Sequence, residues 1–263
     1  MRLAEFADLH GPALERDELK YNLILGLLGR MRETEPPDVR LWTLGAPGEC
    51  AMQTPDYPLV LGRLSAEQCA AFADATLSLD YPGVVGVEET PGLFAARATG
   101  RGVRFAEPMP QTIQALRSKP IYPDVRGTPR VVGRGDAALF SQWLLAFFAE
   151  AVPHEPLPPR GRIETTAASG SYRFWTVDGV PVAMAGIVRR TRHAAAIAGV
   201  YTPPALRNRG YGGAVTAAVA DAVFGEGRTA ACLYTDLRNP ASNRCYAKIG
   251  FEPVCRAWHY LRT

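Results

Sequence analysis

The clearest chemical signal in the chain is a stretch suited to holding a phosphate group, residues 200–213 (VYTPPALRNRGYGG). It runs from an apolar segment through a short turn into the start of a helix built from small residues. The first turn of a helix has unpaired backbone N–H groups and a partial positive charge, and glycines let an anion approach the backbone closely. Arg207 and Arg209 add positive charge beside this turn. We therefore expect this stretch to bind a phosphate-bearing ligand.

A second group of residues follows the next apolar segment. Asn239 stands just before Pro240, which suits the start of a helix, so Asn239 is a candidate N-cap as well as a candidate ligand contact. Tyr246 either packs its ring under a sheet or offers its phenol to the chemistry, and we favour the second role. Asn243, on the same predicted helix, is open to either a surface or a ligand-binding role.

The two groups together resemble the motifs of one enzyme family. The spacing R-x-x-G-x-G at Arg207, Gly210 and Gly212 is similar to the coenzyme A-binding motif of the GNAT (Gcn5-related) N-acetyltransferases. In that family, an asparagine, a small residue, a tyrosine and a glycine-aromatic pair follow a later strand. This chain has them at Asn239, Ser242, Tyr246, Gly250 and Phe251.

The resemblance covers residues 131–263 well and the whole chain loosely. It implies an α/β fold with a mixed sheet, namely the GNAT acyl-coenzyme A N-acyltransferase fold in the C-terminal half, after a smaller, degenerate GNAT-like N-terminal half. It also implies acetyl-coenzyme A as co-substrate, an amine acceptor and no metal. The residues expected to contact the coenzyme are Val200, Tyr201, Thr202, Arg207, Asn208, Arg209, Gly210, Tyr211, Gly212, Gly213, Asn239, Asn243 and Tyr246.

The resemblance further implies direct attack of an amine on the thioester. A bulge in the fourth strand, expected near Val200 or Tyr201, would offer a backbone N–H to the oxyanion. Tyr246 is the candidate catalytic acid for the leaving thiolate, because a tyrosine has a pKa near ~10.

The residue that deprotonates the amine is not evident. Many family members carry a glutamate on the strand before the coenzyme loop, where this chain has only alanine, isoleucine and glycine (residues 194–199). The open alternatives are a relayed water, an amine of low pKa, or one of six side chains: Glu88, Glu89, Glu164, Asp178, His193 and Asp236.

Several elements can be assigned around these motifs. In the C-terminal half we expect a helix after Asp136 with an apolar stripe (Leu139, Phe140, Trp143, Leu144, Phe147 and Phe148) that we assign to the core. Strands over residues 172–177, 182–188 and 194–201 follow, the first two joined by a turn at Asp178-Gly179. Next come a helix over 211–224, a strand over 230–235, a helix over 241–249 and a strand over 254–261.

The proline-rich segment over residues 119–134 marks the expected boundary, giving domains over 1–124 and 125–263. Before it, the pattern predicts helices over 14–31, 93–98 and 111–117, a helix capped by Ser65 that runs to residue 77, and strands over 41–44, 59–61 and 82–87. No catalytic signature is visible in this half.

Composition narrows the class of protein. With 263 residues, 47% hydrophobic and 21% charged, the chain is that of a globular protein of one or two domains. The net charge of +3 is scattered, so we expect neither nucleic-acid nor membrane binding. Five widely spaced cysteines fit neither a disulfide framework nor a structural zinc, and no export signal is visible, so we expect a cytoplasmic protein.

Two functions from different classes remain. One is an N-acetyltransferase acting on a primary amine, and the alternative is a non-catalytic acyl-coenzyme A sensor or regulatory protein. The sequence leaves open the acceptor, the general base, the acyl-chain preference, the role of the N-terminal half and the oligomeric state, a homodimer included.

Overall fold

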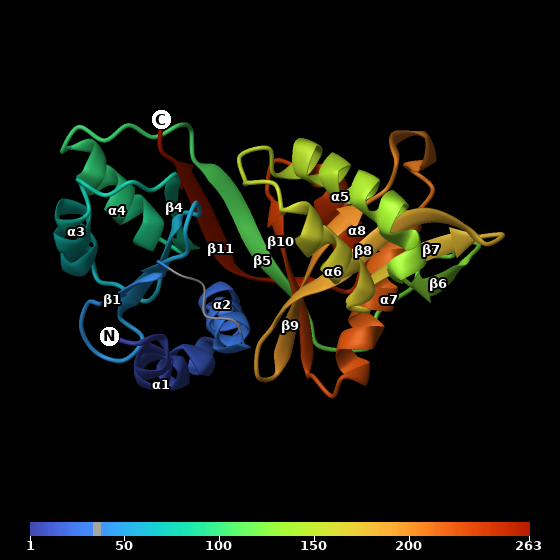
Figure 1. Ribbon diagram of the computed structural model, residues 1–263, viewed down its shortest axis with the longest axis horizontal. Helices are drawn as coiled ribbons and strands as arrows, with labels where there is room; N and C mark the ends of the chain where they lie inside the picture. The colour runs from blue at the N-terminus through green and yellow to red at the C-terminus, as the bar shows by residue number, and fades with distance from the viewer. Residues whose placement is uncertain (34–37) are drawn as a thin grey trace. The chain divides into compact units, whose positions relative to one another are not determined.

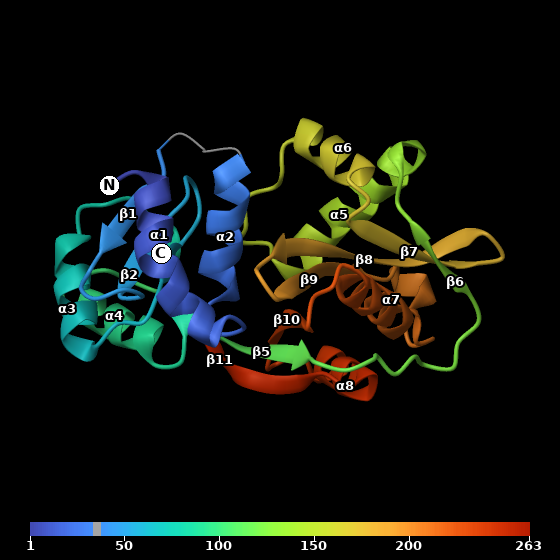
Figure 2. The ribbon, with the colours of Figure 1, turned by 90° about the horizontal axis from the view of Figure 1, so that it is seen from below.

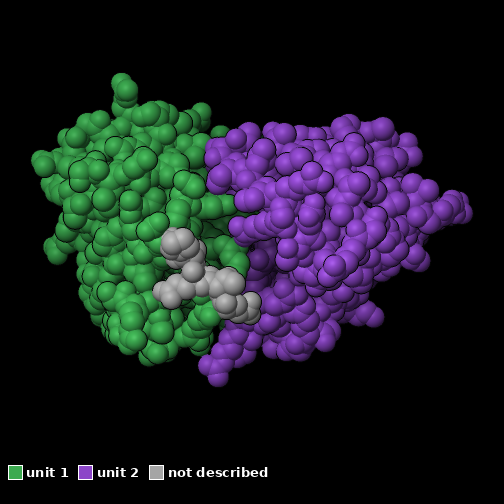
Figure 3. Space-filling model, in the orientation of Figure 1, with its two compact units in different colours: residues 1–113, 234–238, 253–263 green, residues 114–233, 239–252 purple. Residues whose placement is uncertain are grey.

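The computed structural model describes residues 1–33 and 38–263. They form two compact units, coloured separately in Figure 3. The first unit consists of residues 1–113, 234–238 and 253–263, and the second of residues 114–233 and 239–252. The chain passes from the first unit to the second within one strand, β5 (Met109–Leu116). The proposed boundary between residues 124 and 125 stays a prediction.

In its described residues, the first unit contains helices and a sheet (Figure 1). The helices are α1 (Leu3–Leu14), α2 (Asn22–Glu33), α3 (Ala66–Ala75) and α4 (Thr90–Thr99). The strands, in the order in which they lie side by side, are β1 (Arg40–Thr43), β2 (Cys50–Gln53), β3 (Leu59–Leu61), β4 (Gly83–Val87) and β11 (Glu252–Leu261). Neighbouring strands are antiparallel except β3 and β4, which are parallel. Buried side chains of α3 and α4, such as Phe72 and Phe94, pack on one face of this sheet.

The second unit repeats this plan. Its helices are α5 (Ala137–Ala151), α6 (Arg160–Ala168), α7 (Tyr211–Gly225) and α8 (Pro240–Ile249). Its strands, again in spatial order, are β10 (Ala230–Asp236), β9 (Ala194–Tyr201), β8 (Val180–Arg190), β7 (Tyr172–Val177) and β6 (Thr128–Val131). The β6–β7, β7–β8 and β8–β9 pairs are antiparallel, and β9 and β10 are parallel.

Two apolar clusters cover the two faces of the second sheet, as Figure 2 shows for α5 and α6 on one side and α7 on the other. The alanine- and valine-rich α7 packs on alternate residues of β8 and β9, and small side chains allow that close approach. On the opposite face, Phe140, Trp143 and Leu144 of α5 pack against β7 and β9. The predicted core role of this aromatic stripe is confirmed.

Most of the predicted elements of the second unit are confirmed. The Asp178-Gly179 turn joins β7 and β8, with positive φ at both residues (50° and 79°), as a tight hairpin requires. Gly250 ends α8 in the left-handed conformation at φ 106°. Helix α6 was not predicted, because its sequence has no apolar periodicity and only Ile163 and Ala167 are buried.

Two predictions for the N-terminal half are wrong. Residues 111–117 form most of strand β5 rather than a helix, since residues Thr112–Leu116 are all buried and the Thr112 hydroxyl donates to the Cys255 carbonyl of β11 (3.2 Å). The single helix expected over residues 14–31 is interrupted, since α1 ends at Leu14 and α2 begins at Asn22. The Asn22 side-chain amide donates to the Leu19 carbonyl (2.7 Å), a local bond that competes with the helical pattern.

Candidate active site

The predicted phosphate loop lies at the N-terminus of α7, and the helix begins without a side-chain cap. Gly210 is the N-cap residue at φ 80°, and Asn208 also has a positive φ of 62°. The first intrahelical bond runs from the Ala214 N–H to the Gly210 carbonyl (3.0 Å), so the amides of the three residues between them precede the helical ladder. No acidic residue lies in the first turn. This end of α7 is therefore electrostatically suited to an anion.

The surroundings of the loop glycines show what a side chain at each of them would meet. A Cβ at Gly210 would lie 2.7 Å from Val125 Cγ1, closer than side chains approach one another. A Cβ at Gly213 would meet Cys245 Sγ at 3.3 Å and Pro123 at 3.4 Å. Gly212 faces the end of β9, with the Thr202 hydroxyl 3.4 Å from its Cβ position. Close packing of the loop against its own unit thus explains Gly210 and Gly213, while Gly212 leaves room beside Thr202.

The two arginines of the loop have different surroundings. Arg207 donates to the Thr202 carbonyl (2.9 Å) and to the Glu150 carboxylate at the end of α5 (2.5 Å). Its guanidinium also lies 5.9 Å from the ring centroid of Tyr201. Arg209 is exposed and makes one long bond, 3.4 Å, to the Ala205 carbonyl. Arg207 therefore links the loop to β9 and α5, whereas Arg209 is available to a ligand.

Strand β9 is irregular at the position expected for the oxyanion donor. Its pairing with β8 steps from Ala198 opposite Gly186 to Tyr201 opposite Met184, so β9 has one extra residue, and Gly199 lies there at φ 65°. A β-bulge of this kind turns backbone N–H groups out of the ladder. On its other side, β9 pairs with β10 only over Ala194–Ala196 and Ala230–Cys232, although β9 continues to Tyr201. Backbone groups beyond this pairing can bind the amides of a ligand.

The second predicted motif lies on α8. Asn239 is its N-cap, and the side-chain oxygen accepts from the Ser242 N–H (3.1 Å). Asn243 accepts from the Gln114 side-chain amide (3.2 Å) and donates to the Asn239 carbonyl (2.8 Å). The capping role expected for Asn239 is confirmed. The protein contacts of Asn243 hold its amide in a fixed orientation, and its ligand contact stays a prediction.

Tyr246 lies on the edge of the cluster that α7 and α8 share. It packs, partly buried, on the same apolar cluster as Val200 and Tyr211, and its ring is 6.1 Å from that of Phe251. Burial raises the pKa of the Tyr246 phenol well above its usual range, so the hydroxyl keeps its proton at neutral pH. Three of the predicted coenzyme residues, Val200 of β9, Tyr211 of α7 and Tyr246 of α8, thus pack on one cluster.

The candidate bases lie on different elements of the two units. Glu164 is exposed on α6 and bonds Arg160 (3.0 Å), and Asp178 lies in the β7–β8 turn beside Arg126 (2.5 Å). His193 is in the turn before β9. In the first unit, the Asp236 carboxylate accepts a hydrogen bond from the Arg238 backbone N–H (2.7 Å). Glu88 forms an ion pair with Lys20 (3.3 Å).

Within residues 1–33 and 38–263, no three His, Cys, Asp or Glu side chains gather in a way that could hold a metal ion. None of the helices in the same ranges is long and apolar enough to cross a membrane.

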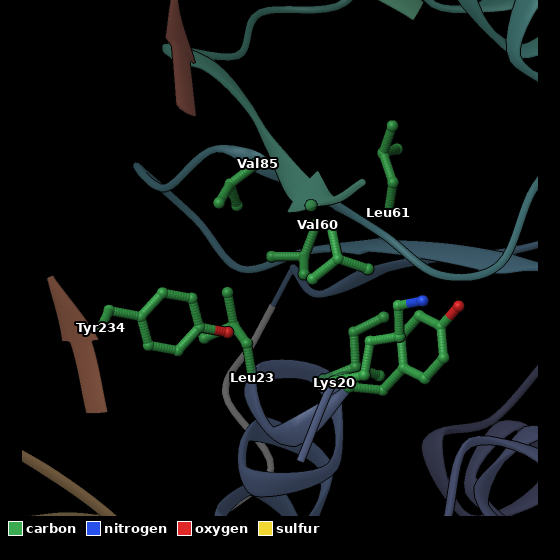
Figure 4. Close-up of a pocket in the computed structure, with 10 residues that line it drawn as sticks. Lys20, Leu23, Val60, Leu61, Val85 and Tyr234 are labelled. Atoms are coloured by element: carbon green, nitrogen blue, oxygen red, sulfur yellow. The ribbon is translucent and has the colours of Figure 1, made fainter. Parts of the chain in front are cut away.

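The first unit contains a small pocket. It is lined mainly by apolar side chains of α2, β3 and β4, with Leu23 and Tyr234 facing Val60 and Val85 (Figure 4). None of the predicted coenzyme residues lines it.

Two residues near the β9 bulge and the loop were missed from the sequence, Tyr172 and Glu150. Neither belongs to a motif, and no pattern in a single sequence links them to residues 199–207.

These features define a class of protein. A parallel strand pair that is bonded only over Ala194–Ala196, a bulged strand and an uncapped glycine-rich helix start are an arrangement suited to an extended, phosphate-bearing ligand. Residues 138–251 match the family model described as the acetyltransferase (GNAT) family. The chain therefore carries a GNAT domain, and the resemblance read from the two motifs is confirmed. A search of curated proteins found no match.

Solved structures show the same fold over most of the chain. A GCN5-related N-acetyltransferase from Kribbella flavida is 18% identical, with a TM-score of 0.61 over 92% of this chain and 95% of that one. An acetyltransferase from the GNAT family of Colwellia psychrerythraea is 12% identical, with a TM-score of 0.57 over 84% of each. A tandem GNAT protein from the clavulanic acid biosynthesis pathway is 14% identical, with a TM-score of 0.55 over 91% of this chain and 87% of that one. The predicted mixed α/β GNAT fold is confirmed.

Proposed function

We propose that the protein is an N-acetyltransferase that transfers the acetyl group of acetyl-coenzyme A to a primary amine of a small molecule or peptide. The observation that carries this proposal is the uncapped start of α7 next to the bulged end of β9, within the GNAT domain. The amides of the first turn and Arg209 would bind the pyrophosphate. Backbone groups of β9 beyond Ala196 would bind the pantetheine amides.

The reaction has two steps in this proposal, addition of the amine and loss of the thiolate. The amine nitrogen forms a bond to the thioester carbonyl carbon, and the carbonyl electrons move onto its oxygen. N–H groups of the bulge near Val200 stabilise that oxyanion. When the carbonyl reforms, the C–S bond breaks and the sulfur leaves with the electron pair, accepting a hydrogen bond from the Tyr246 hydroxyl.

The raised pKa of Tyr246 refines its role. Complete transfer of its proton to a thiolate, whose conjugate thiol has an ordinary pKa near ~8.5, is uphill by about 1.4 kcal/mol for each unit of difference. However, the attacking nitrogen must lose one proton and the sulfur must gain one. The Tyr246 hydroxyl can relay this proton, receiving one as it gives one, so that a neutral amine needs no carboxylate on β9.

The alternative is a non-catalytic acyl-coenzyme A sensor. The specific observation in its favour is that β9 carries alanine, isoleucine and glycine where a base would stand, and that the candidate carboxylates of the second unit, Glu164 and Asp178, are each paired with an arginine. Free thiols at all five cysteines, four of them buried, support a reducing compartment such as the cytoplasm for either function.

We also propose the division of the chain into domains over residues 1–124 and 125–263.

The test combines binding and turnover. Acetyl-coenzyme A binding is measured by calorimetry, and thiol release is then measured across a library of amines, peptides and amino acids. We expect Tyr246→Phe to lower kcat by about 10²-fold or more, with the affinity for acetyl-coenzyme A within twofold. Unchanged turnover would remove Tyr246 from the chemistry. Tight binding without thiol release for any amine would favour the sensor.

A further inference from the structure

Tyr172, the first residue of β7, crosses the sheet of the second unit to reach the bulge of β9. Its register partner on β8 is Gly186, and a Cβ there would lie 2.5 Å from the carbons of the Tyr172 ring. Gly186 in turn is paired with Ala198 of β9. A Cβ at Gly199 would lie 2.7 Å from the Tyr172 hydroxyl oxygen. The ring therefore lies over one glycine, and its hydroxyl occupies the place of the side chain that the other glycine lacks.

The hydroxyl makes no hydrogen bond within the described residues, and Tyr172 as a whole is only 5% exposed. Phe140 holds the ring in an edge-on contact with centroids 4.8 Å apart. A phenylalanine would fill the same space around the ring. What the tyrosine adds at this position is a hydroxyl beside Gly199, and within the described residues that hydroxyl is not one of the fully enclosed polar groups without a partner.

Burial raises the pKa of Tyr172 to about 12, so the phenol is protonated at every physiological pH. A neutral, buried and immobile O–H group is a strong hydrogen-bond donor to developing negative charge, because it needs no reorganisation when the charge appears. The hydroxyl lies at Gly199, within the step between Ala198 and Tyr201 where β9 is bulged. This is the same bulge that offers backbone N–H groups.

We propose that the Tyr172 hydroxyl is a catalytic residue that donates a hydrogen bond to the thioester carbonyl oxygen of bound acetyl-coenzyme A. This inference rests on the proposed function. The bond strengthens when the amine attacks and the oxygen becomes an oxyanion, and it weakens again when the C–S bond breaks. No proton is transferred from Tyr172 at any step, so the residue ends the cycle as it began. Side-chain and backbone donors thus share the oxyanion.

The test uses Tyr172→Phe in the full chain with acetyl-coenzyme A labelled with ¹³C at the carbonyl. Isotope-edited infrared spectra report the carbonyl stretch of the bound thioester directly, without any acceptor amine. We expect the stretch to move to higher frequency in the variant, because a hydrogen bond to the oxygen is lost. With an amine that is turned over, we expect kcat to fall on the order of 10²-fold at an affinity for acetyl-coenzyme A within twofold.

Tyr81→Phe is the matched control, because Tyr81 is 1% exposed, has an enclosed hydroxyl without a partner and lies in the core of the first unit. This control should leave the carbonyl stretch and kcat unchanged. Neither variant should lower Tm, since neither hydroxyl has a protein partner. A lower Tm for Tyr172→Phe alone would show a structural bond and overturn the proposal.

The outcomes also separate this inference from the proposed function. If wild-type protein binds and turns over acetyl-coenzyme A but the carbonyl stretch is the same in Tyr172→Phe, the role of Tyr172 is refuted and the proposed function stands. If wild-type protein does not bind acetyl-coenzyme A, both fall. If the stretch shifts while no amine is acetylated, the hydroxyl binds the thioester of a sensor, and the catalytic role of Tyr172 is refuted together with the transferase.

Discussion

Replacing Gly210 by alanine tests the coenzyme loop at its most constrained point. Gly210 has a φ of 80°, which costs an L-residue about 1–2 kcal/mol. The new Cβ would also lie 2.7 Å from Val125 Cγ1, and overpacking of this kind costs a further 1–3 kcal/mol or so. The sum, about 2–5 kcal/mol, can be relieved only if the loop departs from the conformation that presents the first-turn amides of α7.

We therefore expect Gly210→Ala to weaken coenzyme A binding by roughly tenfold to a hundredfold, with any strain that is not relieved appearing as a lower Tm. Calorimetry with coenzyme A measures the first effect and thermal unfolding the second. Pantetheine, which has no phosphate, should lose little affinity. Adding Val125→Ala removes the clash with the new Cβ, so the double variant should recover the part of the affinity lost to overpacking, on the order of fivefold in Kd. The part lost to the positive φ of residue 210 should not be recovered.

Gly225→Ala is the control on the same helix. Gly225 is the last residue of α7, and nothing lies within 4 Å of its Cβ position. Alanine there should leave coenzyme affinity unchanged and raise stability slightly, by up to about 1 kcal/mol. If Gly210→Ala keeps both the wild-type Kd for coenzyme A and the wild-type Tm, the loop is not a constrained phosphate site and the reasoning is refuted.

Two further predictions follow from individual side chains. Arg209→Ala should weaken coenzyme A binding about tenfold and make the affinity less dependent on salt concentration. Arg207→Ala and Glu150→Ala should each change the affinity by no more than about threefold, because an exposed ion pair contributes only about 0–1 kcal/mol. Equal losses of affinity for the two arginine variants in calorimetry would contradict this assignment. Buried His10 accepts a hydrogen bond from the Gly48 N–H at Nδ1 (3.0 Å), and burial lowers its pKa. The unfolded state therefore binds more protons, and the free energy of unfolding, measured by denaturant titration, should fall as the pH drops below ~6.5, by up to about 1.4 kcal/mol per pH unit. A His10→Gln variant that lost as much stability over the same pH range would show that His10 is not the cause.

The sequence was most informative where local rules and burial agree. Strands β7, β8 and β9 consist of alternating or continuous apolar residues, and turn residues mark where β7 ends and β8 begins. The residue pattern and the positions of the turns therefore predict the same strands. Asp136 shows the limit of such rules. It precedes α5 as predicted, but its carboxylate accepts from the Gly133 N–H (2.9 Å) and from Arg130 (2.8 Å), and it makes no capping bond to α5. The position was predictable, and the partner depended on the fold.

Strand β5 was missed for a related reason. Residues Thr112–Leu116 are all buried, so their burial follows neither a two-residue nor a four-residue period, and polar and apolar types alternate only over Thr112–Ala115. Contacts with a distant segment hold this strand, such as the hydrogen bond from Thr112 to Cys255, 143 residues later. No local pattern contains that information. The same holds for Glu150 and Arg207, which lie 57 residues apart and become partners only in the folded unit.

The two units share one arrangement of elements, yet of the equivalent helices α3 and α7 only α7 starts without a side-chain cap. In the first unit, α3 follows β3 as α7 follows β9, but Ser65 and Gln68 close its N-terminus. The Ser65 hydroxyl accepts from the Gln68 N–H (3.2 Å), and the Gln68 side chain accepts from the Ser65 N–H (2.8 Å). Glu67 then adds a negative charge in the first turn. The capping box stabilises α3 with the amides that an anion would need, and Glu67 would repel that anion, so within the same topology the start of α7 suits the proposed phosphate and the start of α3 does not.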